Sequence, residues 1–176
     1  MPEIRIRVVR ETDLSEILNI YTKEVIEGIA SFETQPPGLD EMTSRLHSVR
    51  AASLPYVVAE LTGKVAGYAY AAPYRPRAAY RYTVESSIYV ASWAQRQGIG
   101  SLLLEELVEA CEQAGARQMI AIISGVSHIA SIRLHEKVGF RRVGTLEKVG
   151  WKFDRWLDTL VMQRSLGPEV SGAPRE

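Results

Sequence analysis

Two glycines stand on either side of one isoleucine in the stretch QRQGIGSLLLEELVEACEQAG, residues 95–115. Glycine lets the backbone approach a ligand closely and adopt positive φ angles. The helix that the following apolar spacing predicts would add unpaired N–H groups and the positive end of its dipole. This combination favours an anion, most often a phosphate. The alternative interpretation is that Gly98 and Gly100 only make a tight turn, and other parts of the chain must decide between the two.

Two common phosphate-binding turns do not fit the residues that follow these glycines. A dinucleotide-binding turn needs a third glycine and an acidic residue about twenty positions later, but the chain has no Asp or Glu between Glu112 and Glu136. A nucleoside-triphosphate loop needs a lysine and a hydroxyl residue directly after its second glycine, whereas Gly100 is followed by SLLL. A phosphate bound here would belong to another class of ligand.

Glu85 lies in the middle of YTVESSIYV, residues 82–90, whose period-two pattern is typical of a strand. The alternation places one set of side chains on one face and the other set on the opposite face: Tyr82, Val84, Ser86, Ile88 and Val90, against Thr83, Glu85, Ser87 and Tyr89. A carboxylate seldom lies inside a central strand without a partner or a task. Glu85 is therefore a candidate general base. The alternative is a structural carboxylate hydrogen-bonded to a tyrosine or arginine.

Two histidines share one stripe of the predicted helix SHIASIRLHEKVGF, residues 127–140, in which His128, Ser131 and His135 follow one another at helical spacing. We expect no metal there, because the two histidines are far apart on the helix and no third ligand clusters with them. His47 is expected to be exposed, and the single cysteine, Cys111, is expected in the core.

Arginines and tyrosines are interleaved in PYRPRAAYRY, residues 73–82, directly before the strand of Glu85. Basic residues among aromatic ones occur in nucleic-acid interfaces, but this cluster is short and the formal net charge is +0. A small anionic substrate fits better, because guanidinium groups bind carboxylates and phosphinates at two points. Plain surface solvation is the alternative for Arg75 and Arg81.

Apolar periodicity predicts the elements that hold these residues. Strands are expected at residues 4–9, 55–61, 64–71, 82–90, 118–124, 141–150 and 151–163. Helices are expected at about residues 14–28, 39–49, 99–114 and 127–139. The third helix has the expected apolar stripe Ile99, Leu102, Leu103, Leu107 and Cys111. Because paired strands open and close the chain while strands and helices alternate at its centre, we expect an α/β fold with a mixed, mostly antiparallel central sheet and helices on both faces.

The composition is that of one globular domain: 176 residues, 46% hydrophobic and 24% charged, with 21 basic and 21 acidic side chains. We assign this domain to residues 1–166 and expect the tail, residues 167–176, to be disordered. No run is long enough to span a membrane, and MPEIRIRVVR at the start lacks the apolar stretch of a signal peptide. We expect a cytoplasmic protein with no membrane or nucleic-acid partner.

The residues Gln95-Arg96-Gln97-Gly98-Ile99-Gly100 satisfy Q/R-x-x-G-x-G/A, the pyrophosphate-binding pattern of the GCN5-related N-acetyltransferases. The chain resembles this family from Ile4 to about Leu166. Within the family, ASFETQP, TVESSIYV, SIRLHEKVGF and VGWKFDRWLD resemble the phosphinothricin acetyltransferase branch. The resemblance implies acetyl-coenzyme A (acetyl-CoA) as the acetyl donor.

The resemblance also implies a set of residues that bind acetyl-CoA. N–H groups of the glycine turn would bind the pyrophosphate, which agrees with the chemistry of a helix start. The pantetheine arm would pair with the fourth strand where that strand separates from the fifth. His128 replaces the asparagine that usually contacts the cofactor, which leaves that contact open. The expected cofactor residues are Ile88, Tyr89, Val90, Gln95, Arg96, Gln97, Gly98, Ile99, Gly100, Ser101, His128 and Ser131.

For catalysis, the resemblance implies Glu85 as the base, acting through water. His135 stands where many relatives have a tyrosine that protonates the departing thiolate and where the phosphinothricin branch has histidine, so it is either a proton donor or a packed residue beside the cofactor.

For the substrate, the resemblance implies contacts from Arg77 and Tyr80, and from Phe32 and Glu33 of the other subunit of a homodimer. The aromatic segments SFETQPPG and WKFDRW fit such an interface, because they would otherwise expose apolar area.

The expected activity is transfer of an acetyl group from acetyl-CoA to the amino group of a small anionic amino-acid-like compound. Phosphinothricin, methionine sulfoximine or sulfone, and arsinothricin are of this type. The amine would attack directly, with Glu85 as general base. One alternative is an acetyltransferase of peptide or protein N-termini, and another is a non-catalytic module that senses acetyl-CoA.

Overall fold

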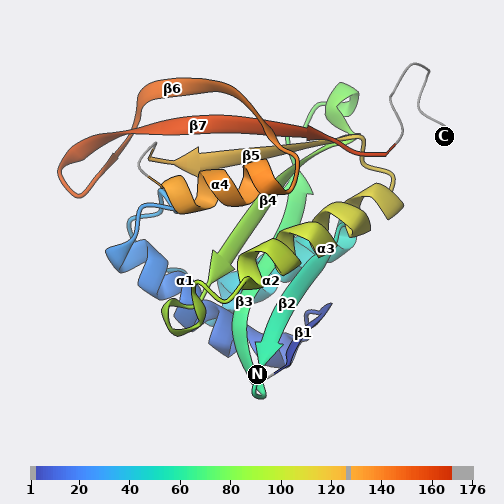
Figure 1. Cartoon of the computed structure of the whole chain (residues 1–176). Coiled ribbons are helices and arrows are strands. Elements are labelled where there is room, and N and C mark those ends of the chain that lie inside the picture. Colours follow the sequence, from blue (N-terminus) through green and yellow to red (C-terminus); the bar gives the residue numbers. More distant parts are fainter. Residues whose placement is uncertain (1–2, 126–127, 168–176) are drawn as a thin grey trace.

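The computed structural model describes residues 3–125 and 128–167. The described residues form a seven-stranded sheet with four α-helices (Figure 1). The strands are β1 (Ile4–Val8), β2 (Tyr56–Leu61), β3 (Lys64–Pro73), β4 (Thr83–Val90), β5 (Gln118–Ser124), β6 (Arg141–Lys152) and β7 (Arg155–Ser165). The helices are α1 (Leu14–Glu27), α2 (Leu39–Ala51), α3 (Ile99–Gln113) and α4 (Ile129–Lys137). The tail expected to be disordered lies outside the described residues from residue 168 onward.

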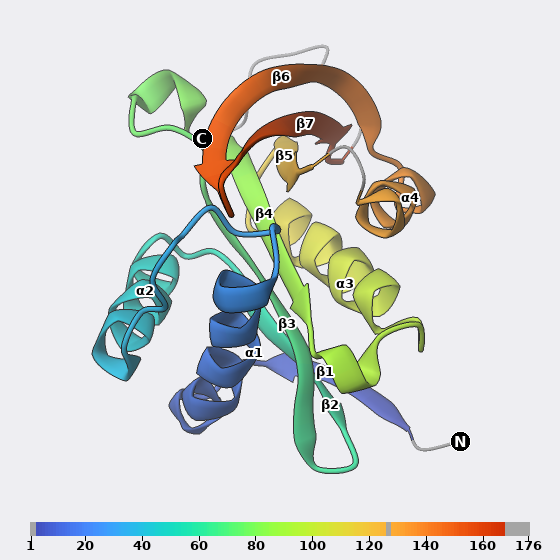
Figure 2. The ribbon, with the colours of Figure 1, turned by 90° about the vertical axis from the view of Figure 1, so that its left-hand side faces the viewer.

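The sheet has the order β1-β2-β3-β4-β5-β7-β6, and only its β4–β5 pair is parallel. The expected mixed, mostly antiparallel sheet is therefore confirmed. Figure 2 shows α1 and α2 on one side of β3 and β4, with α3 and α4 on the other. Each side has its own apolar cluster: Ile17 of α1 and Leu46 of α2 belong to one, and Leu103 and Leu107 of α3 to the other. The expectation of helices on both faces is also confirmed.

The sheet opens in its middle, between β4 and β5. Their pairing runs from Thr83 and Gln118 to Ser86 and Ala121, and then stops. β5 continues beside β7 as far as Ser124 opposite Thr159, whereas β4 continues beside β3 as far as Val90. In Figure 1, β5 and β7 run across the top of the molecule while β4 descends away from them. Among the described residues, the second half of β4 therefore has no strand on the β5 side.

Two details differ from the sequence expectations. The last two strands do not divide between Gly150 and Trp151. The turn is at Phe153 and Asp154, whose positive φ angles of 51° and 54° make a tight hairpin. In α3, Leu102 is 40% exposed, because the buried stripe is wider on the side of Leu104 and Val108. None of the described helices is long and apolar enough to cross a membrane.

Candidate active site

The two glycines of the expected turn are required for different reasons. Gly98 directly precedes α3 with a φ of +82°, and a Cβ there would meet nothing within 4 Å. Its requirement is therefore conformational. Gly100 lies inside the first turn of α3, and a Cβ there would be 3.1 Å from Leu134 Cδ2 of α4 and 3.8 Å from Val90 Cγ2. Its requirement is spatial, since it lets α3 start close to both elements. Among the described residues, the N–H groups of Ile99 and Gly100 at this end of α3 lack helical acceptors, whereas that of Ser101 donates to the carbonyl oxygen of Gly98 at 3.0 Å.

A cavity of about 610 Å³ extends from this turn along the unpaired half of β4 to the start of α4. Every residue predicted to bind acetyl-CoA lines it except Gln97 and Ser101. The side chain of Gln97 is exposed and its Nε2 lies 3.4 Å from the carbonyl oxygen of Trp93. Ser101 lies one residue further into α3, with its Oγ 3.5 Å from Nζ of Lys137. The structure therefore brings together, around one cavity, residues from β4, from the glycine turn before α3 and from the start of α4.

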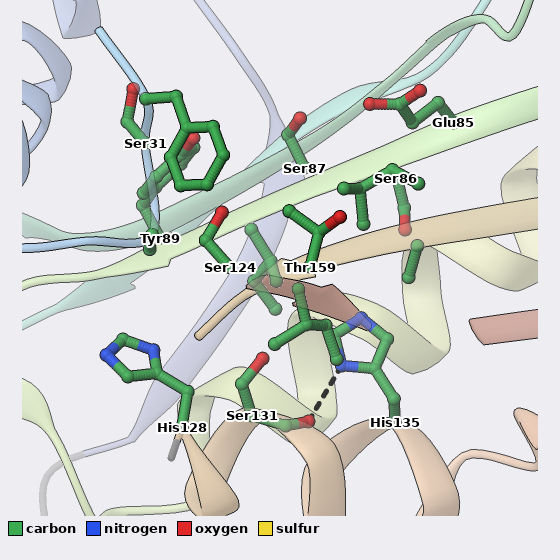
Figure 3. A pocket seen from close by; sticks show the side chains of 16 residues that line it. Ser31, Glu85, Ser86, Ser87, Tyr89, Ser124, His128, Ser131, His135 and Thr159 are labelled. Atoms are coloured by element: carbon green, nitrogen blue, oxygen red, sulfur yellow. Dashed lines mark hydrogen bonds between the residues drawn. The ribbon is translucent and has the colours of Figure 1, made fainter. Parts of the chain in front are cut away.

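A second cavity, of about 250 Å³, adjoins the first where β4 and β5 separate (Figure 3). Ile88 and Tyr89 of β4 line both cavities, as do His128 and Ser131. The other walls come from the loop after α1, from β5 and from β7. A ligand that entered along β4 would therefore reach the second cavity through the opening in the sheet.

Glu85 lines the second cavity near the start of β4. It lies opposite Ala72 of β3 and Ile120 of β5, and its side chain is half-buried. Burial raises the pKa of its carboxyl, and the charge of Arg75 partly offsets that rise. No hydrogen bond from another described side chain acts on this pKa. The carboxylate is thus available to accept a proton, and the tyrosine or arginine partner of the structural alternative is absent among the described residues.

His135 lies on α4, and Figure 3 shows it across β4 and β5 from Glu85. Its side chain is 2% exposed, and its Nδ1 is 2.8 Å from the carbonyl oxygen of Ser131. A carbonyl only accepts, so Nδ1 carries the proton and Nε2 of the neutral ring has none. Burial lowers the pKa of His135, although the hydrogen bond to Ser131 opposes this. The ring is also packed edge-on against Phe140, with centroids 5.0 Å apart. At neutral pH this histidine can accept a proton at Nε2 but has none to donate there.

His128 immediately precedes α4 and lines both cavities. No three His, Cys, Asp or Glu side chains in residues 3–125 and 128–167 gather as a metal site would require. The absence of a metal stays a prediction. His47 is exposed, as expected, and Cys111 is fully buried in the core.

The expected substrate residues are not all in the cavity. Arg77 and Tyr80 lie in the short turn before β4, are exposed, and line neither cavity. The arginine whose charge acts on Glu85 is instead Arg75, which lies over the ring of Tyr74 at 5.1 Å. The interleaved pattern indicated a cluster of arginines but not which of them acts electrostatically on the carboxylate.

Phe32 lines the second cavity of its own chain, although the resemblance implied that it reaches a pocket of the other subunit. Glu33 does not line the cavity, because its carboxylate pairs with Nη1 of Arg45 at 2.8 Å. Sequence reasoning missed Ser124 and Thr159, which lie opposite each other in β5 and β7 and place buried hydroxyl groups at the cavity. An isolated serine or threonine in a strand carries no signal that would have revealed this.

Comparisons with known proteins agree with this geometry. The acetyltransferase (GNAT) family matches residues 14–140. A phosphinothricin N-acetyltransferase from Alcaligenes faecalis is 50% identical over 161 residues, which are 92% of this chain and 82% of that protein. An L-methionine sulfoximine/L-methionine sulfone acetyltransferase from Salmonella typhimurium (strain LT2) is 34% identical over 161 residues, 92% of this chain and 94% of that protein.

Among solved structures, a GNAT superfamily phosphinothricin acetyltransferase from Sinorhizobium meliloti in complex with acetyl-CoA superposes with a TM-score of 0.94. It is 44% identical, and the match covers 98% of this chain and 94% of that chain. The chain therefore belongs to the GNAT acetyltransferase family, in its phosphinothricin acetyltransferase branch, and is an acetyl-CoA N-acetyltransferase of the phosphinothricin and methionine sulfoximine type.

Proposed function

We propose that residues 1–166 form one domain that acetylates the amino group of a small anionic amino-acid-like compound, with Glu85 as general base. Phosphinothricin, methionine sulfoximine or sulfone, and arsinothricin are candidate acceptors. The observation that carries this proposal is the half-buried carboxylate of Glu85, which has no hydrogen-bonding partner among the described side chains. It lines the second cavity, which adjoins the first cavity beside β4. The names of the relatives from A. faecalis and S. typhimurium support the class of acceptor.

The first cavity is the proposed binding site of acetyl-CoA. The N–H groups around Gly98 and Gly100 would hold the pyrophosphate, because they combine a helix start with an approach that no Cβ obstructs. The pantetheine arm would take the place of a strand beside Ile88, Tyr89 and Val90, whose backbone pairs with no other described strand on the β5 side. The thioester would then lie at the opening between β4 and β5. The solved relative that contains acetyl-CoA supports this assignment of the donor.

In the proposed reaction, Glu85 accepts a proton from the ammonium group of the substrate, directly or through one water molecule. The amine nitrogen then forms a bond with the carbonyl carbon of the thioester, and the carbon–sulfur bond breaks with its electron pair going to sulfur. The second proton that the nitrogen loses to become an amide goes to this thiolate or to solvent, so the products are the N-acetyl compound and the thiol of coenzyme A. No enzyme group is acetylated. A raised pKa favours this task. A general base works best when its pKa lies near the operating pH, and burial moves the pKa of Glu85 in that direction.

We assign His135 a supporting role in this reaction. Its Nδ1 proton is bound to the carbonyl of Ser131, and burial opposes the imidazolium form that a proton donor at Nε2 would require. The thiolate of coenzyme A is a tolerable leaving group without a proton. His135 would therefore shape the cavity beside the cofactor and offer Nε2 as an acceptor.

The acidic end of the acceptor would meet the arginines before β4. Arg75 acts electrostatically on Glu85, and Arg77 follows it by two positions at the start of the exposed turn. A guanidinium that binds a carboxylate or phosphinate at two points would orient the amine toward Glu85. This predicts preference for anionic acceptors over neutral ones.

The test is acetylation of a panel of amines by the purified protein with acetyl-CoA, followed by mass spectrometry of the products. Phosphinothricin, methionine sulfoximine and the common amino acids are compared with methioninamide, which has an amino group but no carboxylate, and with a short peptide. Preference for the anionic amino acids supports the proposal. Preference for the peptide would favour an N-terminal acetyltransferase, and absence of any product despite acetyl-CoA binding would favour a sensing module.

We also propose a homodimer. The hairpin of β6 and β7 carries Trp151 and Trp156, which are more than half exposed and packed against each other with ring centroids 5.2 Å apart. Val143, Leu146 and Val149 of β6 are also about half exposed. A second copy of the chain would remove this apolar area from water. A monomeric mass by light scattering at micromolar concentration would contradict the proposal.

A further inference from the structure

Two residues near the end of β6 are buried although the rest of the strand is exposed. From Arg141 to Val149 every residue of β6 is exposed, whereas Gly150 and Lys152 are buried. They point to the same face because strand residues alternate. Both contact the loop between α1 and α2, at Phe32 and Ser31. Figure 2 shows this loop, in blue, passing in front of β4 toward the end of β6.

Gly150 leaves space for the ring of Phe32. A Cβ on Gly150 would fall within the ring, against its Cε2, Cδ2 and Cζ atoms. The φ angle of Gly150 is not in the positive range that favours glycine. The glycine is thus required by the aromatic ring that lies on its backbone, and not by the shape of the strand.

Lys152 holds the neighbouring residue of the same loop. Its Nζ donates a hydrogen bond of 2.8 Å to the carbonyl oxygen of Ser31, and only 4% of the residue is exposed. The carboxylates of Glu24 and Glu33 act on this ammonium only from a distance. A buried ammonium is costly when no counter-ion lies close to it, and none pairs with Lys152 among the described residues. Its Nζ lies 5.0 Å from the centroid of the Phe153 ring, and its hydrogen bond ties β6 to the backbone at Ser31.

The same loop is a wall of the second cavity. Ser31 and Phe32 line it together with Glu85. Helices α1 and α2 hold the other side of the loop, because Tyr21 Oη is 2.9 Å from Ser31 Oγ and Arg45 pairs with Glu33. The contacts from β6 come from the other half of the sheet, since β6 is the edge strand on the far side of the opening between β4 and β5. They connect the two halves of the molecule across that opening.

We infer that Gly150 and Lys152 are positioning residues that hold Ser31 and Phe32 as a fixed wall of the second cavity, and that they thereby set the affinity for the amine. This inference rests on the proposed function, since it takes the second cavity as the place of the amine. Acetyl-CoA would bind along β4 and the glycine turn, in the first cavity, which Ala30 of the same loop also lines but Ser31 and Phe32 do not. Loosening the wall at Ser31 and Phe32 should therefore raise the KM of the amine more than that of acetyl-CoA.

The first test replaces Lys152 with Met, which keeps the length of the side chain but removes its donor, and with Arg, which restores a donor. For Lys152→Met, the KM of the amine should rise about ten- to a hundredfold, the worth of one charged hydrogen bond. The KM of acetyl-CoA should change less than about twofold, as expected for a substitution that does not touch its binding site. Lys152→Arg should recover part of the loss. Equal changes in both KM values, or no change in either, would overturn the inference.

The second test replaces Gly150 with Ala in the wild type and in a Phe32→Ala background. In the wild type the new Cβ displaces the ring and the KM of the amine rises. With Phe32→Ala already present the space is empty, so adding Gly150→Ala should have no further effect. Gly144→Ala is the matched control, because it is on the same strand and its Cβ would meet nothing within 4 Å. If Gly150→Ala acts equally in both backgrounds, the ring is not the reason for the glycine.

A third measurement separates failure of the inference from failure of the proposed function. Hydrogen exchange of the amides at residues 30–33 should be faster in Lys152→Met than in the wild type, whether or not any amine is acetylated, while exchange in α3 stays unchanged. If the wild type acetylates no amine but exchange responds in this way, the proposed function fails and the wall contact stands. If amines are acetylated but exchange at residues 30–33 does not respond, the inference fails by itself.

Discussion

Replacing Glu85 with Gln removes the proposed base and almost nothing else. The side chains have nearly the same shape, and Glu85 has no hydrogen bond from another described side chain that the change would break. We therefore expect a folded protein with normal acetyl-CoA affinity. Positioned base catalysis contributes about 10²–10⁴ in rate, or roughly 3–5 kcal/mol. Turnover with a saturating anionic amine should fall by that factor near neutral pH.

The pH dependence makes this prediction specific. In the wild type, kcat/KM should fall on the acid side as Glu85 becomes protonated, at a pH above that of an ordinary glutamate because burial raises its pKa. Glu85→Gln should lose this acid limb. Its deficit should also become smaller at high pH, where the amine is already neutral and needs no base. Release of the coenzyme A thiol, followed spectroscopically from acid to alkaline pH, measures both effects. A variant with the wild-type pH–rate profile would refute the assignment.

Stability gives an independent check of the same residue. A carboxyl whose pKa is higher in the folded protein than in the unfolded chain makes folding less favourable once pH rises through and above this range. Glu85→Gln removes that cost. The variant should therefore melt at the same or a higher temperature than the wild type at neutral pH, and the difference should disappear in acid below the ordinary glutamate pKa. Glu147→Gln, at an exposed position of β6, is the control. A variant that is less stable at neutral pH would show that Glu85 has a structural partner.

Three further predictions concern the other parts of the site. Replacing both Gly98 and Gly100 with Val should weaken acetyl-CoA binding in calorimetry. The causes are backbone strain at the first position and a clash with α4 at the second. Normal binding by the folded variant would show that the turn is only structural. His135→Ala should lower turnover less than Glu85→Gln does, and loss of all activity with intact acetyl-CoA binding would show that the histidine is essential. Arg77→Ala should raise the KM of an anionic amine by a factor that corresponds to about 1.5–3 kcal/mol for a lost charged hydrogen bond. Arg75→Ala should raise the same KM, and equal effects of either change on methioninamide would contradict the anchor.

Local features of the site could be predicted from the sequence because they depend on neighbouring residues. The alternation of β4 places Glu85 and Tyr89 on one face, as the sequence predicts, and Tyr89 indeed packs against Tyr21 of α1. Gly98 has the left-handed conformation that its position before a helix predicts. Side-chain direction along a strand and the φ angle of a glycine are properties of a few consecutive residues. The resemblance to a known family then supplied the ligand, which periodicity could not.

Other features depend on contacts between distant parts of the chain. The hairpin turn at Phe153 and Asp154 contains no glycine, so its positive φ angles are imposed by the pairing of β6 with β7. Arg75 and Arg77 are both exposed and line neither cavity. That the charge of Arg75 lowers the pKa of Glu85 depends on how the loop before β4 lies against the sheet. The identity of these residues was plain from the sequence, but their distances were not.

The cavity itself is a tertiary property. It exists because β5 follows β7 and β4 follows β3, so that their parallel pairing ends at Ser86 and Ala121. Its wall is held by Lys152, which contacts a residue 121 positions earlier in the chain. Neither the end of a strand pair nor a contact over that separation has a signature in the adjacent residues, because each is decided by which elements the whole fold packs together.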